Sequence, residues 1–398
     1  NGLKRSGRVQ CTFRTEGGTP RLWNPADGSM REMAVYTVEK DGRLTLPLWF
    51  NPSDSFFVVF DRADKKRRPL EISYKNTAHA PTEKLTIVKA EYGVGKTQLD
   101  LTDPVRAEVK DNTLDLANFV RFKGDPVPGQ VKQMTLHYLL DQKPFIATAK
   151  DGETITLPPR SAEQAFDVFA ERNSVKVLAL KNGEYSIDGK TLEIQSLPLP
   201  CEIKGDWTIT FQKTRGAPEQ IMTRELKTLG SFEDFGVKHF SGTATYRTAF
   251  EHRSVSAHGS NLASRIYLDL GEVAVIASAT LNGKPLGLRW KPPFRFDVTG
   301  LLREGNNELE VEVTTTWVNR LIGDEYYPDD VTPKGTWKEG GLPVVPEWLV
   351  KNSPRPEPRR ITFAAFKFWK KTDPLHAAGL MGPVALHYAQ SVHIPKGE

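Results

Sequence analysis

The residues best suited to chemistry lie in one acidic and aromatic stretch, residues 324–330, which reads Asp-Glu-Tyr-Tyr-Pro-Asp-Asp. Carboxylates accept hydrogen bonds from sugar hydroxyls, and aromatic rings stack on the C–H faces of sugars. A glycosidase needs two carboxylates roughly 5–10 Å apart, so the stretch could also supply catalytic acids. A polar surface loop with its two aromatic rings folded inward would have the same composition. The stretch therefore predicts a carbohydrate contact, with a purely structural loop as the alternative.

The residues just before this stretch are candidates too, because they follow a predicted strand, and loops at strand ends often carry function. Arg320 could form a bidentate pair with a carboxylate, either that of Asp324 or that of an acidic sugar. An Arg320–Asp324 pair that only holds its own loop is the alternative. Tryptophans near strand ends could stack on sugars, or pack in a core or at its rim. The predicted carbohydrate-binding set is Trp290, Trp317, Asn319, Arg320, Asp324 and Tyr326.

The sequence contains none of the common catalytic motifs. There is no Gly-x-Ser-x-Gly elbow, no phosphate-binding loop and no His-Glu-x-x-His zinc motif, and the 8 His residues are scattered. Cys11 and Cys201 lie far apart without metal-ligand spacing, although a single disulfide between them is possible. Cys11 lies in a predicted strand, where a small core residue is the default. We therefore assign no catalytic residue, no metal ligand and no cofactor.

Composition narrows the class of protein. The 398 residues carry a formal net charge of +5, from 54 basic and 49 acidic residues. The basic runs at residues 65–68 and 355–360 are not interleaved with aromatic residues, which favours solvated loops over a nucleic-acid surface. No apolar stretch approaches the ~18 residues of a membrane-spanning helix, so we expect neither a nucleic-acid partner nor a membrane span. The chain begins at Asn1 and runs directly into a predicted strand, so we expect its start to be a processing or truncation point.

Alternating apolar and polar residues predict an all-β protein. Asn or Asp followed by Gly suits the positive φ angles of two-residue hairpins, and such pairs, including Asp188-Gly189 and Asn282-Gly283, separate several alternating runs. Helix signals are few, although residues 161–172 and 218–229 could each form a short helix. No strand–helix–strand alternation occurs, so neither an (α/β)8 barrel nor a doubly wound sheet is expected. Several antiparallel β-sandwich domains are the predicted fold.

Breaks in the pattern near residues 79–81, 157–159 and 197–206 indicate domain boundaries. Within the last block, residues 329–360 are rich in Pro, Gly and charge and show few strand signals. Such long irregular segments in compact domains are usually functional or disordered. This segment is therefore of interest alongside the acidic stretch that precedes it.

Residues 265–324 include the runs Arg-Ile-Tyr-Leu-Asp-Leu-Gly-Glu-Val, Ala-Thr-Leu-Asn-Gly-Lys-Pro-Leu and Gly-Asn-Asn-Glu-Leu-Glu-Val-Glu-Val. This segment resembles the galactose-binding-like jelly roll, the sugar-binding domain of glycoside hydrolase family 2 and its relatives. Residues 240–246, 316–324 and 378–384, with Trp-Val-Asn-Arg-Leu-Ile-Gly-Asp and Gly-Leu-Met-Gly-Pro-Val, resemble the C-terminal part of glycoside hydrolase family 106, the α-L-rhamnosidases. Residues 13–25 resemble the sandwich that follows that family's catalytic barrel.

The resemblance implies a domain order. It places a first β-sandwich at residues 1–81, completed by 163–204, an inserted accessory β-domain at 82–162, and a galactose-binding-like jelly roll at 205–392. In that family the catalytic carboxylates and calcium belong to an N-terminal (α/β)8 barrel, and this sequence contains no such barrel. Smaller departures are Arg21, where the family tends to carry Glu, and Ala378, where Ser is usual.

The leading hypothesis is a non-catalytic, carbohydrate-binding and structural C-terminal region of an α-L-rhamnosidase-like glycoside hydrolase acting on plant or algal polysaccharide. Its expected partners are a rhamnose-containing polysaccharide or oligosaccharide and the missing barrel, whose active site a loop shaped by Arg320 and Asp324 could help to close. A secreted or periplasmic location follows from the resemblance alone. The alternatives are a free-standing carbohydrate-binding protein and a glycosidase that uses residues 324–330. An apolar patch, a narrow aromatic platform or two facing carboxylates, one with a raised pKa, would distinguish the three.

Overall fold

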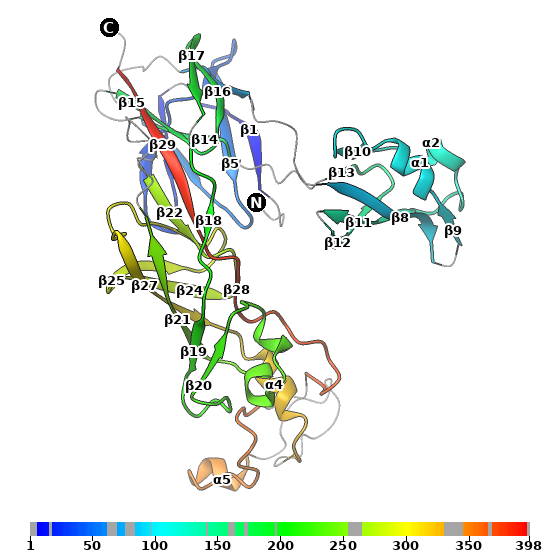
Figure 1. Cartoon of the computed structure of the whole chain (residues 1–398), viewed down its shortest axis with the longest axis vertical. Helices are drawn as coiled ribbons and strands as arrows, with labels where there is room; N and C mark the ends of the chain where they lie inside the picture. The colour runs from blue at the N-terminus through cyan, green and yellow to red at the C-terminus, as the bar shows by residue number, and fades with distance from the viewer. Residues whose placement is uncertain are drawn as a thin grey trace.

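The computed structural model describes residues 6–15, 18–61, 70–75, 84–95, 97–140, 142–157, 164–170, 174–195, 197–253, 265–329, 345–364 and 368–395. Over these residues the predicted all-β class is confirmed, because antiparallel sheets dominate and the helices are short (Figure 1). The longest helix in the described ranges has seven residues, and no helix there is long and apolar enough to cross a membrane. The basic run at residues 65–68 lies outside the described residues.

The N-terminal sandwich combines residues 7–75 with residues 166–194. Five strands form its main layer in the order β15-β14-β3-β2-β6, and two small sheets, β1-β5-β4 and β17-β16-β7, share cores with that layer. In β5 alternate side chains are buried, so leucines from one face enter the core. The strands are β1 (Gly7–Phe13), β2 (Thr19–Trp23), β3 (Met30–Glu32), β4 (Thr37–Val38), β5 (Leu44–Phe50), β6 (Phe57–Asp61), β7 (Ile72–Lys75), β14 (Phe166–Ala170), β15 (Ser174–Ala179), β16 (Gly183–Ile187) and β17 (Lys190–Ile194).

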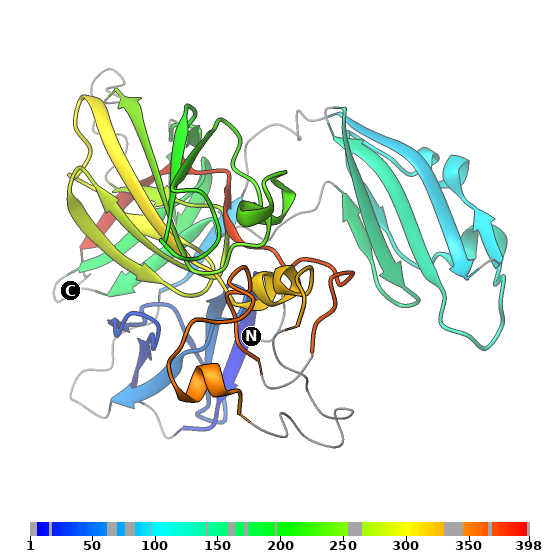
Figure 2. The ribbon, with the colours of Figure 1, turned by 90° about the horizontal axis from the view of Figure 1, so that it is seen from below.

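The accessory domain, residues 85–157, stands apart from the rest of the chain in both views (Figures 1 and 2). Its four-stranded sheet has the order β12-β11-β8-β9, and two short helices and a two-stranded sheet contribute to one separate core. The core joins Tyr92 and Leu136 of the sheet to Val105 and Phe119 of the helical segments. Its elements are β8 (Leu85–Val94), β9 (Thr97–Asp100), α1 (Thr102–Ala107), β10 (Leu114–Leu116), α2 (Val120–Lys123), β11 (Gln133–Leu140), β12 (Lys143–Lys150) and β13 (Ile155–Leu157).

The C-terminal sandwich packs a six-stranded sheet, β20-β19-β21-β27-β24-β25, against strands β26, β22 and β29. Buried residues from both layers, among them Tyr246, Val311, Phe296 and Leu386, form one core. The elements are β18 (Cys201–Glu202), β19 (Trp207–Phe211), β20 (Gln220–Thr223), η1 (Leu229–Ser231), α3 (Phe235–Lys238), β21 (Thr243–His252), β22 (Arg265–Asp269), β23 (Glu272–Ala274), β24 (Ile276–Leu281), β25 (Lys284–Arg289), β26 (Arg295–Asp297), β27 (Gly305–Thr314), α4 (Val318–Asp324), α5 (Glu347–Val350), β28 (Gly379–Gly382) and β29 (Ala385–Pro395).

Strand β29 belongs to both sandwiches. Its first half, residues 385–389, pairs with β22, and its second half, residues 390–395, pairs with β15. Leu386 contributes to the C-terminal core, whereas Ile394 packs on the core of the N-terminal sandwich. One continuous backbone ladder therefore fixes the two sandwiches relative to each other, and the domain boundaries proposed from sequence stay predictions.

Two of the predicted hairpin turns have the expected backbone. Asp188 and Gly189, between β16 and β17, have φ angles of 48° and 77°, and Asn282 and Gly283, between β24 and β25, have 52° and 77°. Positive φ at both central residues is what a type I′ turn requires, and Asn, Asp and Gly tolerate it best. These turns fix the register of the two hairpins.

The helices expected at residues 161–172 and 218–229 are wrong where the structure describes them. Phe166–Ala170 is strand β14, which pairs with β15 and β3, and Val168 is buried in the sandwich core. Gln220–Thr223 is strand β20 at the edge of the six-stranded sheet. Local helix signals are weak, and pairing with a neighbouring strand overrides them.

Candidate functional site

Five of the six predicted site residues lie on or beside one short helix. Trp317 is the N-cap of α4, and Tyr326 follows its C-terminus. We expected a loop just past a strand end, and that expectation is wrong, because residues 318–324 are helical. Asn319, Arg320 and Asp324 are all buried there, and we refer to these three as the α4 hub.

Arg320 and Asp324 form the ion pair that was the structural alternative from sequence. Arg320 Nη2 lies 3.0 Å from Asp324 Oδ1, and the two side chains are 2% and 1% exposed. Residues four apart lie on one face of a helix, so the α4 helix brings them together. The guanidinium also lies over the Phe235 ring, 5.7 Å from its centre. The backbone N–H of Arg320 donates to Ser241 Oγ at 3.1 Å.

Gly323 leaves the space that this pair needs. A Cβ at position 323 would lie 2.7 Å from Arg320 Nη2 and 2.6 Å from His239 Cβ. Both distances are shorter than the van der Waals contact of two heavy atoms, about 3.5–4.0 Å. Any larger residue would therefore push the arginine or His239 out of place.

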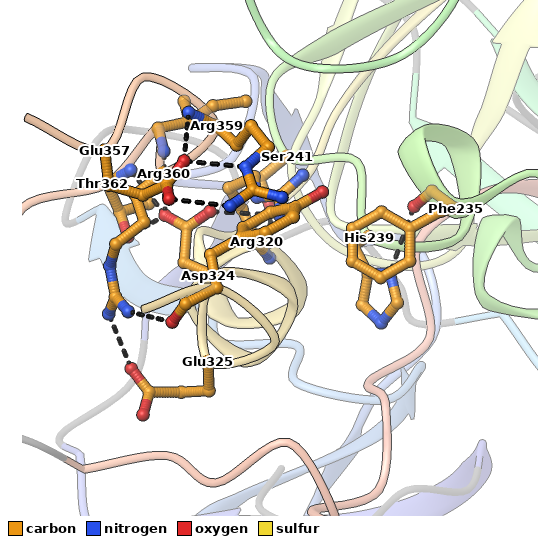
Figure 3. A network of polar contacts seen from close by, with 12 residues as sticks. Phe235, His239, Ser241, Arg320, Asp324, Glu325, Glu357, Arg359, Arg360 and Thr362 are labelled. Carbon is orange, nitrogen blue, oxygen red and sulfur yellow. Dashed lines mark hydrogen bonds and ion pairs between the residues drawn. The ribbon is translucent and has the colours of Figure 1, made fainter. Parts of the chain in front are cut away.

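The second oxygen of Asp324 binds a distant segment of the chain. Oδ2 accepts hydrogen bonds from Ile361 N at 3.0 Å, Thr362 N at 2.6 Å and Thr362 Oγ1 at 2.6 Å (Figure 3). These partners belong to the irregular segment that follows α4. We call its described parts, residues 325–329, 345–364 and 368–378, the excursion.

Asn319 binds the far end of the excursion. Its Nδ2 donates to the His376 carbonyl oxygen at 2.8 Å, and its Oδ1 accepts from the His376 N–H at 2.8 Å. An amide side chain thus replaces both backbone partners of His376. Asn319 and Asp324 together attach two separate points of the excursion to one turn of helix.

Ion pairs extend this network beyond the hub. Arg360 is 11% exposed, and its guanidinium lies 2.7 Å from Glu325 Oε1 (Figure 3). It also lies 3.0 Å from Asp329 Oδ1. The basic run at residues 355–360 is therefore not simply a solvated loop. Its last arginine is largely buried because two acids of the 324–330 stretch neutralise it. Glu357 pairs with Arg359 at 2.7 Å, and this hydrogen bonding lowers the pKa of Glu357 to about 2.

Trp317 and Tyr326, two aromatic residues predicted to contact sugar, are exposed but already contact other residues of the chain. The Arg215 guanidinium lies 4.5 Å from the centre of the Trp317 ring. Tyr326 donates its hydroxyl to the Lys371 carbonyl at 3.0 Å and packs edge-on against Phe235. Both rings retain an open surface, so sugar contact by Trp317 and Tyr326 stays a prediction.

His239 lies buried beside the hub. Its Nδ1 is 3.0 Å from the Phe235 carbonyl oxygen, and its ring contacts that of Tyr326 with centroids 5.6 Å apart. Burial lowers the pKa of His239, and the Arg320 guanidinium lowers it further against the opposing hydrogen bond to Phe235. The neutral tautomer that donates from Nδ1 fits this contact.

Trp290, the sixth predicted residue, is not part of this network. It follows β25 and lines a separate cavity between the two sandwiches. No pattern of residues indicated that the six predicted residues lie in two separate places. The structure does so because the β25–β26 connection faces the N-terminal sandwich, whereas α4 leads into the excursion.

The described acids of the 324–330 stretch are already engaged with basic side chains. Asp324, Glu325 and Asp329 are each held in ion pairs, and Asp330 lies outside the described residues. These ion pairs hold the excursion and α4 together, so the arrangement suits anchoring.

Several partners in the network were not predictable from the sequence. Ser241, Thr362 and His376 contact the hub from 38 to 79 residues away, and neither type nor spacing marks them. Arg360 was noticed only as part of a basic run. Long-range polar pairs of this kind leave no periodic pattern in a sequence.

Comparisons with known proteins support a carbohydrate-related class. No protein-family model matches the chain. A Formosa agariphila protein named "Putative beta-glucuronidase" is 30% identical over a 486-residue alignment, which covers 97% of this chain and 41% of the relative. The chain is thus glycoside hydrolase-like in sequence along nearly its whole length, and it spans about two fifths of this curated relative.

Solved structures show more distant likenesses. The rhamnosidase from Novosphingobium sp. PP1Y is 22% identical with a TM-score of 0.47, and the match covers 97% of this chain and 22% of that one. A Ruminococcus gnavus β-glucuronidase is 15% identical with a TM-score of 0.25, and the match covers 29% of this chain and 21% of that one. Both matches cover less than a quarter of the solved chain.

Proposed function

We propose that this chain is a non-catalytic C-terminal region of an α-L-rhamnosidase-like glycoside hydrolase, with a galactose-binding-like jelly roll as its last domain. In this role the α4 hub holds the excursion in one shape, and the excursion packs against a catalytic (α/β)8 barrel of the same enzyme. The rhamnose-containing polysaccharide substrate and export from the cytoplasm are parts of the same proposal. The similarity to part of a much longer glycoside hydrolase-like relative supports it.

The observation that carries the proposal is that the excursion is anchored by buried polar groups and yet exposes large apolar side chains. Buried polar groups of α4 bind its backbone at His376, Ile361 and Thr362. Elsewhere on the excursion, large apolar side chains remain exposed, namely those of Val345, Leu349, Val350, Phe363 and Phe368. An isolated domain gains nothing from fixing exposed apolar groups, whereas a region that packs on a partner domain does.

The acidic stretch as a catalytic site is the weaker alternative. Its described acids are each held in an ion pair with Arg320 or Arg360. A role in shaping one side of a neighbouring active site needs only rigid placement, which these ion pairs supply.

Hydrolysis assays and a hydrophobic dye test this proposal. We expect the chain alone to hydrolyse neither aryl α-L-rhamnosides nor aryl β-D-glucuronides. We expect it to bind anilinonaphthalene sulfonate, and the Leu349→Asp/Val350→Asp variant to bind much less, while Val38→Asp on the exposed strand β4 serves as the control. We call the packing of the excursion against a barrel the bracing role. It would be contradicted if the chain hydrolysed a substrate and Glu325→Gln abolished that hydrolysis, or if the double variant bound as much dye as wild type.

A further inference from the structure

A cavity of about 340 Å³ lies between the two sandwiches, and no residue of the α4 hub lines it. The N-terminal sandwich contributes Asn24 and Asp27 from one turn and Asp167 from β14. The C-terminal sandwich contributes Tyr267 of β22 and Trp290 of the β25–β26 connection. Strand β29 joins the two sandwiches, so the walls of the cavity are held at a fixed separation.

The charges that line this cavity balance. Four acidic and four basic side chains belong to its described lining: Asp27, Asp54, Asp167 and Asp297 against Arg31, Arg289, Lys291 and Arg295. A lining without net charge has no preference for an ionic ligand. It presents many hydrogen-bond donors and acceptors instead, as the hydroxyl groups of a neutral sugar require.

Ion pairs hold these polar groups in place. Arg31 Nη1 lies 2.7 Å from Asp167 Oδ2, and Asp297 pairs with Arg265 at 2.8 Å. Lys291 pairs with Asp54 across the two sandwiches. An ionised carboxylate accepts about four hydrogen bonds, so one ion pair does not use its whole acceptor capacity. The donors and acceptors are therefore ordered before a ligand arrives, which lowers the entropic cost of binding.

Aromatic rings complete the lining. Trp290 is 51% exposed, and the Lys291 Nζ lies over its ring at 6.0 Å from the ring centre. Stacking on the exposed part of an aromatic face suits the C–H side of a pyranose. The Tyr267 hydroxyl is a second contact. Burial and the neighbouring Asp297 raise the pKa of Tyr267, so the hydroxyl remains protonated at neutral pH and can donate.

We propose that this interdomain cavity binds one neutral pyranose unit of a polysaccharide, with Trp290 stacking on the ring and the flanking side chains bonding its hydroxyls. The volume is at the lower end of the range for small-molecule sites, about 300–1,000 Å³, which suits one sugar unit. The ligand class rests on the carbohydrate role proposed above. The bracing role does not depend on this cavity, so the two proposals can fail separately.

Calorimetric titration of the full chain tests the cavity. The neutral probes are methyl α-L-rhamnopyranoside and a rhamnose-containing oligosaccharide, and D-galacturonate is the charged probe. Trp290→Ala should weaken binding of the neutral probe at least tenfold. Trp317→Ala tests the competing prediction of sugar contact beside α4. Phe145→Ala is the control, because it removes an exposed aromatic ring from the separate accessory domain, and it should leave affinity within twofold. Tyr267→Phe keeps the ring and the fold and should weaken binding severalfold.

Four results would overturn the proposal. They are no binding of any neutral probe by the folded chain, unchanged affinity in Trp290→Ala, a loss in Trp317→Ala equal to that in Trp290→Ala, and tighter binding of galacturonate than of the neutral probe. A loss confined to Trp317→Ala would assign sugar binding to the α4 region instead. None of these results would affect the dye-binding and hydrolysis tests of the bracing role.

Discussion

Thr362 donates both its backbone N–H and its hydroxyl to one oxygen of Asp324, each at 2.6 Å, across 38 residues of sequence. The other oxygen of Asp324 lies 3.0 Å from Arg320 Nη2. One buried carboxylate therefore neutralises an arginine and fixes the excursion at the same time. Loss of its charge should disturb both.

We expect Asp324→Asn to destabilise the C-terminal sandwich by about 3–5 kcal/mol, because it leaves the buried Arg320 guanidinium without its counter-ion. The asparagine amide would also place a donor where the wild-type oxygen accepts. Thermal unfolding followed by calorimetry measures the loss. Hydrogen exchange should show faster opening at the Thr362 amide.

Glu310→Gln is the control for this change. Glu310 pairs with Arg247 at 2.6 Å, but both side chains are substantially exposed. Exposed pairs contribute about 0–1 kcal/mol, so stability should hardly change. If the two variants lose similar stability, the buried pair is not the anchor that we describe.

Asn319→Ala should release the far end of the excursion. It removes both hydrogen bonds to the His376 backbone, and unsatisfied buried groups cost about 1–3 kcal/mol. We expect faster hydrogen exchange at the His376 amide with little change at Thr362, which Asp324 still holds. Asn306→Ala, on an exposed position of β27, is the control and should change neither amide.

The strands and hairpins were largely predictable from the sequence, because a half-buried strand repeats every two residues. The runs at 44–48, 207–211, 266–270 and 308–313 all lie in or overlap strands. The Asn282-Gly283 turn was predictable for a chemical reason, since those residues tolerate positive φ. Strand pairing between distant segments, such as β14 with β3, leaves no comparable signal, and there a helix was wrongly expected.

The candidate site was predictable only in part. Residue types indicated that Arg320 and Asp324 could form an ion pair that holds its own segment, as an alternative to binding a ligand. The helical backbone of residues 318–324 was missed because seven residues around a Gly carry little helical periodicity. The partners Thr362 and His376 were missed because their contacts arise from the path of the excursion, which the local sequence does not encode.

His239 should make stability depend on pH. Its pKa is lowered in the folded chain, chiefly by burial, so the unfolded chain binds a proton more readily. Stability therefore rises with pH between the folded pKa and the unfolded value of about 6.5, and it falls as the pH drops below that value. Above pH 7 this residue contributes no pH dependence.

His239→Asn isolates this contribution, because the asparagine amide can replace the Nδ1–H donor to the Phe235 carbonyl. We expect wild type to lose more stability than the variant when the pH falls from 7.5 to 5.5, as measured by chemical denaturation at both values. His137→Asn, in strand β11 of the separate accessory domain, provides the control. Identical pH dependence in wild type and His239→Asn would contradict the prediction.

Lys291 and Asp54 form a nearly buried pair that joins the two sandwiches, with side chains 11% and 5% exposed. Lys291→Met should cost about 2–5 kcal/mol, since it removes the lysine that pairs with the nearly buried Asp54 carboxylate. The Asn51 N–H still donates to that carboxylate at 2.7 Å, which favours the lower part of the range. Asp54→Asn should also destabilise, because it leaves the lysine unpaired.

The double variant Lys291→Met/Asp54→Asn separates the free energy of the Lys291–Asp54 interaction from the contributions of each residue's other contacts. With both charges removed, neither partner is left buried and uncompensated, so its loss should be smaller than the sum of the two single losses. Calorimetric unfolding of all four proteins gives the coupling free energy, for which we expect about 1–3 kcal/mol. Losses that add without coupling would show that the two charges act independently, and that β29 alone fixes the sandwiches.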